Sequence, residues 1–169
     1  MRYMGKEVFK NCSKAKVADH IFDGAGLEYA YPYTFAWCPN LQSVDYAFEA
    51  SHIKYIDKDF FRYNEHVTSC LHLFHRASKI SAIPQGLFDY FTKCTDFRAM
   101  FKSCVLLKEI PHDLFKNCIS MTAVDECFCG GQLNGDVSYP KFMNITSNVP
   151  PLWDKHYWDT DEYKAQYQY

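Results

Sequence analysis

The sequence lacks the features that mark several large functional classes. Its charges nearly cancel, with 18 basic and 20 acidic residues and a net charge of −2. A nucleic-acid-binding domain usually carries a basic stripe that recruits phosphates, so this balance argues against that class. The chain also has no apolar run of about 18 residues or more, the length that a membrane-spanning helix needs. We therefore expect neither nucleic-acid binding nor membrane insertion.

Secretion and catalytic motifs are missing as well. Basic residues lie between Met1 and Lys16, but no apolar segment typical of a secretory signal follows them. The location is thus left open between a virion or cell surface reached by another route and the cytoplasm. No glycine-rich phosphate loop, Gly-x-Ser-x-Gly elbow or clustered carboxylate pair occurs. We expect no enzymatic activity and no cofactor.

Aromatic residues are abundant, with 14 Phe and 13 Tyr in the chain. Phenylalanines recur at steps of 13 or 14 residues, and we call them the ladder phenylalanines: Phe9, Phe22, Phe35, Phe48, Phe61, Phe74, Phe88, Phe101, Phe115, Phe128 and Phe142. Even and odd steps differ, so the repeating unit is a pair of steps, 26 or 27 residues long. A fixed period of this length is typical of a solenoid.

A small residue usually stands three positions after the ladder phenylalanine: Cys12, Ala25, Cys38, Ser51, Asn64, Ala77, Cys104, Cys118 and Gly131. Phe91 and Ile145 break this rule. Two residues three positions apart share one face of a helical turn. An extended apolar stretch follows, and Pro84 or Pro111 ends it in the clearest repeats.

A single turn with its extended stretch is too small to bury its own apolar face, but stacked neighbouring units can bury it. We predict a repeat α/β solenoid, leucine-rich-repeat-like, of about five coils of 26–27 residues, each with short strands and helical turns. The solenoid should span residues 1–149, and residues 150–169 should form a C-terminal cap and a polar, aromatic tail. The ladder phenylalanines should be buried, in particular Phe35, Phe61, Phe74, Phe88, Phe101 and Phe115.

Three strings carry a family resemblance: Met100-Phe-Lys-Ser-Cys, Leu-Lys-Glu-Ile-Pro and Leu114-Phe-Lys-Asn-Cys. They resemble the BspA-like leucine-rich repeats of surface proteins of gut bacteria and of virion proteins of their phages. The resemblance covers roughly residues 8–154 and implies a fold, but it brings no catalytic motif. It implies a non-enzymatic recognition or adhesion module that binds a protein or glycan at a cell surface. The alternative is a structural virion subunit, in a phage tail or associated with a capsid.

The eight cysteines fit the repeat better than a disulfide framework. Four occupy the small repeat position, and three others occupy inward positions: Cys12, Cys38, Cys104 and Cys118, then Cys70, Cys94 and Cys127. Free cysteine behaves as a small hydrophobe, so we expect buried, reduced thiols. The alternative is a metal site, from Cys70, His72 and His75 with Cys127 and Cys129. Zinc sites prefer two paired ligand clusters at regular spacing, so we predict no metal site.

Aromatic side chains on the surface are the candidate binding residues. Tyr29, Tyr31, Tyr33 and Trp37 gather around one coil, and Trp153, Tyr157 and Trp158 lie near the C-terminus. Tyrosine and tryptophan are favoured at interfaces because they bury a large area at low entropic cost. For Trp153 and its neighbours, capping of the last coil is the alternative interpretation.

The N-terminal coil has little apolar cover. Only Tyr3, Met4 and Val8 precede the first ladder phenylalanine as large apolar or aromatic residues besides the initiating methionine. A solenoid exposes its core at an end that no atypical segment covers. We therefore expect oligomer formation through this coil, or cover from an upstream part of the same protein.

Overall fold

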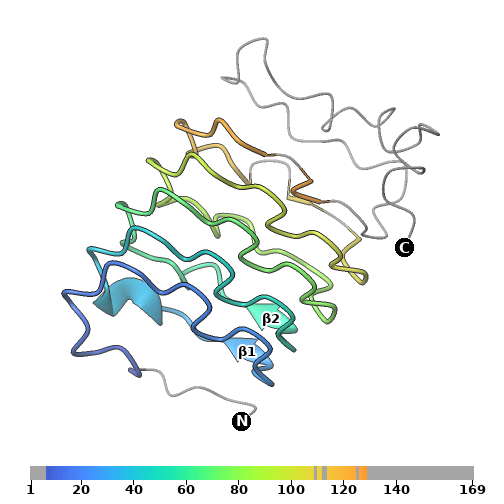
Figure 1. Ribbon diagram of the computed structural model, residues 1–169, viewed down its shortest axis with the longest axis horizontal. Coiled ribbons are helices and arrows are strands. Elements are labelled where there is room, and N and C mark those ends of the chain that lie inside the picture. Colours follow the sequence, from blue (N-terminus) through green and yellow to red (C-terminus); the bar gives the residue numbers. More distant parts are fainter. Residues whose placement is uncertain (1–6, 109, 112–113, 125, 129–169) are drawn as a thin grey trace.

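The computed structural model describes residues 7–108, 110–111, 114–124 and 126–128. Within this part the chain winds into stacked coils (Figure 1). Parallel β-bridges join the same point of successive coils: Val17 to Ser43, Ser43 to Ser69, Ser69 to Asp96 and Asp96 to Ala123. The bridged residues are 26 positions apart in the first two steps and 27 in the last two. This confirms the predicted coil length. The expected division at residues 149 and 150 lies outside the described residues.

Regular secondary structure is sparse in the described part. Strands β1 (Tyr29–Ala30) and β2 (Tyr55–Ile56) pair in parallel, with Tyr29 opposite Tyr55, and η1 is a 3-10 helix at Phe35–Trp37. The prediction of short strands and helical turns in every coil is therefore wrong in detail, since the other described coils consist of turns and single bridges. No described helix is long and apolar enough to cross a membrane.

Backbone conformation explains the short elements. Many residues two positions before a ladder phenylalanine adopt positive φ: His20, Tyr33, Tyr46, His72, Gly86, Ala99 and Glu126. Several residues two positions after it do so as well: Gly24, Ala50, Tyr63, Arg76 and Ser103. The left-handed region belongs to neither strand nor right-handed helix, so each of these residues interrupts a regular element. The chain bends sharply on both sides of the phenylalanine.

The sheet of β1 and β2 ends where the coils lengthen. The extra residue of the longer coils lies between Phe74 and Phe88 and again between Phe101 and Phe115, and Pro84 and Pro111 occupy the same segments. Proline has no N–H to donate to a neighbouring strand. Among the described residues no third strand joins this sheet.

From Phe9 to Phe115, each turn at a ladder phenylalanine is closed by a hydrogen bond. The backbone N–H three residues later donates to the carbonyl oxygen of that phenylalanine, at 2.8 Å for Cys12 to Phe9 and 2.9 Å for Cys38 to Phe35. The same bond forms even where Phe91 replaces the small residue, at 2.9 Å to Phe88. The spacing of three residues thus indicated a turn correctly.

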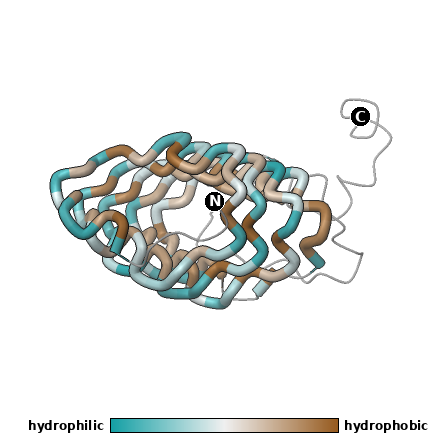
Figure 2. Tube along the Cα trace, turned by 90° about the horizontal axis from the view of Figure 1, so that it is seen from below, coloured by the Kyte–Doolittle hydropathy of each residue, from teal (hydrophilic) through white to brown (hydrophobic). Residues whose placement is uncertain are grey.

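Seen in Figure 2, the outline of the coils is a flattened oval. Inside the coils the ladder phenylalanines stack in two columns. The first column contains Phe22, Phe48, Phe74, Phe101 and Phe128, with adjacent ring centroids 5.1–5.5 Å apart. The second column contains Phe9, Phe35, Phe61, Phe88 and Phe115, with adjacent centroids 5.1–6.4 Å apart. The columns also touch each other, as in the edge contact between Phe35 and Phe48 at 6.3 Å.

Burial of the ladder is confirmed. Phe35, Phe61, Phe74, Phe88, Phe101 and Phe115 are all buried. Phe9 and Phe22 are only partly buried, although both pack against the core. Met1 to Lys6 lie outside the described residues, so association through the N-terminal coil stays a prediction.

Several side chains at the small repeat position tie neighbouring coils together. The amide nitrogen of Asn64 donates to the carbonyl oxygens of Phe35 and Cys38, both at 3.0 Å. The thiol of Cys104 donates to the carbonyl of Phe74 at 3.2 Å, and that of Cys118 to Phe88 at 3.6 Å. All these acceptors lie one coil earlier. Cysteine is therefore both a small apolar residue and a weak donor here.

All seven cysteines within the described part are free thiols, and six of them are buried. Burial raises the pKa of Cys104 to about 12 and that of Cys38 to about 11, where Cys12 adds to the effect. Such thiols are protonated at neutral pH and poor nucleophiles. They serve the packing of the solenoid, as expected from their place in the repeat.

A row of polar contacts also links the first three coils. Asp19 Oδ1 accepts hydrogen bonds from the hydroxyl of Ser43 at 2.5 Å and from the backbone N–H of Asp45 at 2.9 Å. Asp45 Oδ1 repeats this pattern with Ser69 at 2.6 Å and the N–H of Leu71 at 2.8 Å. The third coil has Leu71 where its predecessors have aspartate, and this side-chain pattern ends there.

Candidate functional site

The first group of surface aromatics lies at the β1–β2 pair, and we call it the tyrosine cluster: Tyr29, Tyr31 and Tyr55. The ring centroid of Tyr29 is 4.6 Å from that of Tyr31 and 6.1 Å from that of Tyr55. Ala30 between the two tyrosines is buried, so the alternation of a strand turns both tyrosines outward. The parallel register then brings Tyr55 alongside them from the next coil.

The second group follows the second column of phenylalanines, and we call it the aromatic ridge: Tyr33, Arg62, Trp37, Tyr63 and Tyr90. Trp37, Tyr63 and Tyr90 each stand two residues after a ladder phenylalanine, in three successive coils. Trp37 is 38% exposed, Tyr33 43% and Tyr63 51%. A repeat that buries the phenylalanine thus presents another aromatic ring to solvent in each of these coils.

Arg62 lies at the centre of the aromatic ridge. Its guanidinium carbon is 5.6 Å from the ring of Tyr33 and 5.2 Å from that of Tyr63. Asp59 Oδ1 accepts a hydrogen bond from it at 3.2 Å, and a hydrogen bond with Tyr63 raises the pKa of the guanidinium. Tyr90 meets Tyr63 edge-on with ring centroids 5.8 Å apart. The ridge therefore combines a permanent positive charge with open aromatic faces.

The four described aromatics predicted from the sequence fall into both groups. Tyr29 and Tyr31 belong to the tyrosine cluster, whereas Tyr33 and Trp37 belong to the aromatic ridge. Trp37 carries its own cation, since Lys10 Nζ lies 6.0 Å from its ring. Trp153, Tyr157 and Trp158 lie outside the described residues.

Sequence reasoning missed four members of these groups: Tyr55, Arg62, Tyr63 and Tyr90. Alignment of the coils would have found two of them, because Tyr63 and Tyr90 occupy the position of Trp37. Tyr55 required the parallel register with Tyr29, one coil length earlier. Arg62 has no repeat signal, and its importance follows only from the two rings that it contacts.

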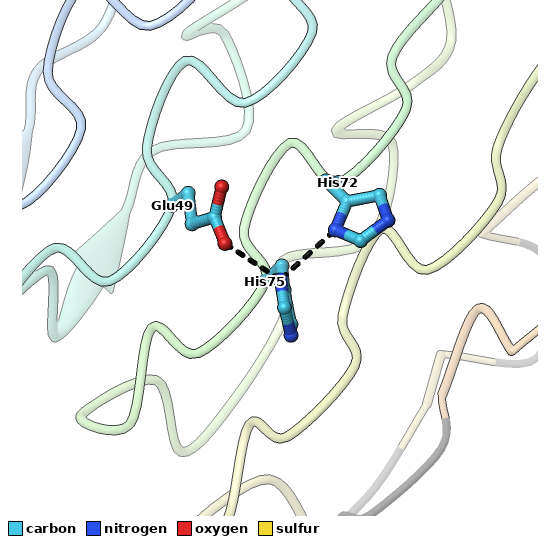
Figure 3. Close-up of side chains that lie close together, drawn as sticks. All are labelled: Glu49, His72 and His75. Carbon is cyan, nitrogen blue, oxygen red and sulfur yellow. Dashed lines mark hydrogen bonds and ion pairs between the residues drawn. The ribbon is translucent and has the colours of Figure 1, made fainter.

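A separate polar cluster lies beside the first column and consists of Glu49, His72 and His75 (Figure 3). His75 Nδ1 is 2.8 Å from Glu49 Oε1 and 2.9 Å from His72 Nδ1. The turn around Phe74 brings the two imidazoles together, with the N–H of His75 donating to the carbonyl of His72 at 3.0 Å. Glu49 comes from the preceding coil, whose Ala50 N–H donates to the His75 carbonyl at 2.7 Å.

The surroundings keep both imidazoles neutral at pH 7. Burial, with help from the cations Arg76 and Lys102, lowers the pKa of His75 to about 4 although the Glu49 carboxylate lies beside it. Burial and the neighbouring His75 lower the pKa of His72. His72 is half-buried and its ring stacks on Tyr46 at 4.8 Å between centroids. Neutral imidazole is the form that ligates metals and exchanges protons.

Cys70, grouped with these histidines in the sequence, does not join them. Its sulfur points into the core, 3.6 Å from the sulfur of Cys94 and 3.7 Å from that of Met100. Alternation alone would place Cys70 and His72 on the same side, but the positive φ of His72 (55°) interrupts the extended segment and starts the turn. Cys129, the other proposed partner, lies outside the described residues.

No family model matches the chain, and no curated protein matches it. Among solved structures, it is similar to a chain from the Toll–Spatzle complex, described as a hub in Drosophila development and innate immunity. The two sequences are 14% identical, the TM-score is 0.37, and the match covers 74% of this chain and 22% of that chain. This chain therefore spans about a fifth of the length of the Drosophila protein chain.

Proposed function

We propose that the chain is a non-enzymatic recognition module whose aromatic ridge binds a protein or a glycan at a cell surface. The observation that carries this proposal is the exposure of Trp37 and Tyr63 in successive coils, with the half-buried Tyr90 beside Tyr63 and with Arg62 held between two tyrosine rings. The ridge gathers the three residue types most enriched at the energetic centres of interfaces, namely tryptophan, tyrosine and arginine.

The scaffold favours this use of the ridge. Each exposed ring is two residues from a buried phenylalanine whose turn is closed by a hydrogen bond, so the backbone beneath the ridge is fixed. Tyrosine and tryptophan have only two side-chain torsions to order on binding. A partner therefore meets a surface that loses little conformational entropy on binding.

Binding can be tested with the labelled full chain on arrays of extracellular proteins and of glycans. We expect the Tyr33→Ala/Tyr63→Ala double variant to lose about tenfold or more in affinity for any ligand found, the loss typical of an interface centre. The control is Ile21→Ala, which removes an exposed apolar side chain beside the first column. This variant should bind within about twofold of the original chain.

Three outcomes would redirect the proposal. Equal binding by the double variant and the original chain would move the site away from the ridge. Loss of binding only in Tyr55→Ala would assign it to the tyrosine cluster. Concentration-dependent self-assembly in light scattering, abolished by the double variant, would favour the structural virion subunit over a recognition module.

A further inference from the structure

We propose that Glu49, His72 and His75 form a binding site for one divalent transition-metal ion of the zinc type, held between the second and third coils. The donor atoms of the three residues all lie within 4.8 Å of one another. Figure 3 shows the Glu49 carboxylate and the His72 ring on opposite sides of His75, with Nδ1 of His75 in contact with both.

Counting protons shows why an ion suits this arrangement. A ring nitrogen of neutral imidazole carries either a proton or a lone pair. If His75 Nδ1 is protonated, one proton serves both Glu49 Oε1 and His72 Nδ1, which then both present lone pairs to it. If His72 Nδ1 is protonated instead, the lone pair of His75 Nδ1 faces the carboxylate 2.8 Å away. In either case one proton lies among the three facing atoms, while the other two atoms present lone pairs. A bound cation would accept a lone pair from each of the three residues.

The ligand set matches a known coordination chemistry. Two imidazoles and one carboxylate, with a fourth position open to water, are a common donor set for zinc. Metal–nitrogen bonds of about 2.0–2.1 Å place tetrahedral donors about 3.3 Å apart. The two separations at His75 Nδ1, 2.8 and 2.9 Å, are slightly shorter, so an ion would lengthen each by about half an ångström. The donor atoms of Glu49 and His72, which lie within 4.8 Å of each other, would adjust to the same spacing. Half-buried Glu49 and His72 leave an approach from solvent.

Electrostatics around the cluster are mixed. Arg76 and Lys102 act against a cation, since both lower the pKa of His75. Lys102 is paired with Glu126 at 2.8 Å, which offsets its charge, and the Glu49 carboxylate supplies a negative charge within the site itself. The balance favours an ion that bonds strongly to nitrogen over a hard ion such as magnesium.

The site can be tested with zinc and cobalt on the reduced, metal-free full chain. We expect calorimetry to find one zinc ion bound per chain, and cobalt to give weak visible bands without a thiolate-to-cobalt charge-transfer band. His72→Gln and Glu49→Gln should each weaken zinc binding by about tenfold or more, since changing even an outer-shell partner of a metal ligand costs about that much. Both side chains are half-buried, so these variants keep the core intact, and His75, which is buried, is left unchanged.

The matched control is His20→Gln. His20 occupies the position of His72 two coils earlier and contacts Asp23 at 3.2 Å, in an exposed pair without a third ligand. This variant should bind zinc as the original chain does. Zinc should raise the melting temperature of the original chain and of the control, but not that of the two site variants. Zinc binding that is absent, indifferent to His72→Gln and Glu49→Gln, or accompanied by thiolate charge transfer would overturn the proposal.

Discussion

The turns around the two phenylalanine columns share one interior and differ on the outside. Beside the first column, the rings of His20, Tyr46 and His72 stack with centroids 4.7 and 4.8 Å apart. The ionisable side chains of Asp23, Glu49 and His75 lie next to them. Beside the second column, the outer positions hold the aromatic ridge and its cations. The repeat thus determines what is buried, while the outer positions of each turn are free to carry different chemistry on the two sides.

The strongest test of the shared interior is removal of one ring from each column. We expect Phe101→Ala and Phe61→Ala each to lower the free energy of unfolding by about 3–5 kcal/mol, the usual range for a buried aromatic. Urea unfolding of the two variants measures this directly. As a surface control, Tyr63→Ala should change stability by at most about 0.5 kcal/mol. A loss below about 1 kcal/mol in one column only would show that the two columns are not equivalent.

A second test separates the donors at the small repeat position. Asn64→Ala removes two hydrogen bonds to buried carbonyls of the second column, and we expect a loss of about 2 kcal/mol. Cys104→Ala removes one weak thiol donor from the first column and should lose about 1 kcal/mol. Thermal and urea unfolding should rank the variants in this order. A larger loss for Cys104→Ala would mean that packing, rather than hydrogen bonding, dominates at this position.

The smallest expected effects concern the left-handed residues, where glycine should be favoured over alanine beside both columns. Ala50 beside the first column has φ of +50°, so Ala50→Gly should raise stability by about 0.5 kcal/mol by removing strain. Gly86 beside the second column has φ of +83°, and a β-carbon there would lie 3.1 Å from Asp89 Oδ2. Gly86→Ala should therefore lower stability by about 1 kcal/mol. Two changes of the same sign in matched unfolding curves would contradict this account.

The features that repeat could be predicted, because the period of 13 or 14 residues places every ladder phenylalanine at the same point of a coil. The turn bond three residues later followed from the same spacing. The left-handed residues could not be foreseen, since Tyr46, Ala50 and Arg76 have no special propensity for positive φ. Strands in every coil were expected from the apolar pattern alone, which does not reveal these interruptions.

The two candidate sites depend on contacts between coils rather than within them. Glu49 and His75 are 26 positions apart, one coil length, so their pairing needs the register that the bridges define. Cys70 and His72 are neighbours in sequence but face opposite ways, which proximity along the chain could not reveal. Arg62 acquires its place between Tyr33 and Tyr63 through side-chain conformations that no spacing encodes.

The aspartate–serine row also bears on how such a chain could lengthen. The second coil has both halves of the contact, because Ser43 binds the aspartate of the coil before it and Asp45 binds the serine of the coil after it. If this coil were duplicated in tandem, every serine and aspartate at these positions would have a hydrogen-bond partner in a neighbouring coil. The third coil has Ser69 but ends the row with Leu71, so a copy placed after it would bring a serine without an aspartate. The coils are therefore not interchangeable units, and the second is the one best suited to be inherited in extra copies.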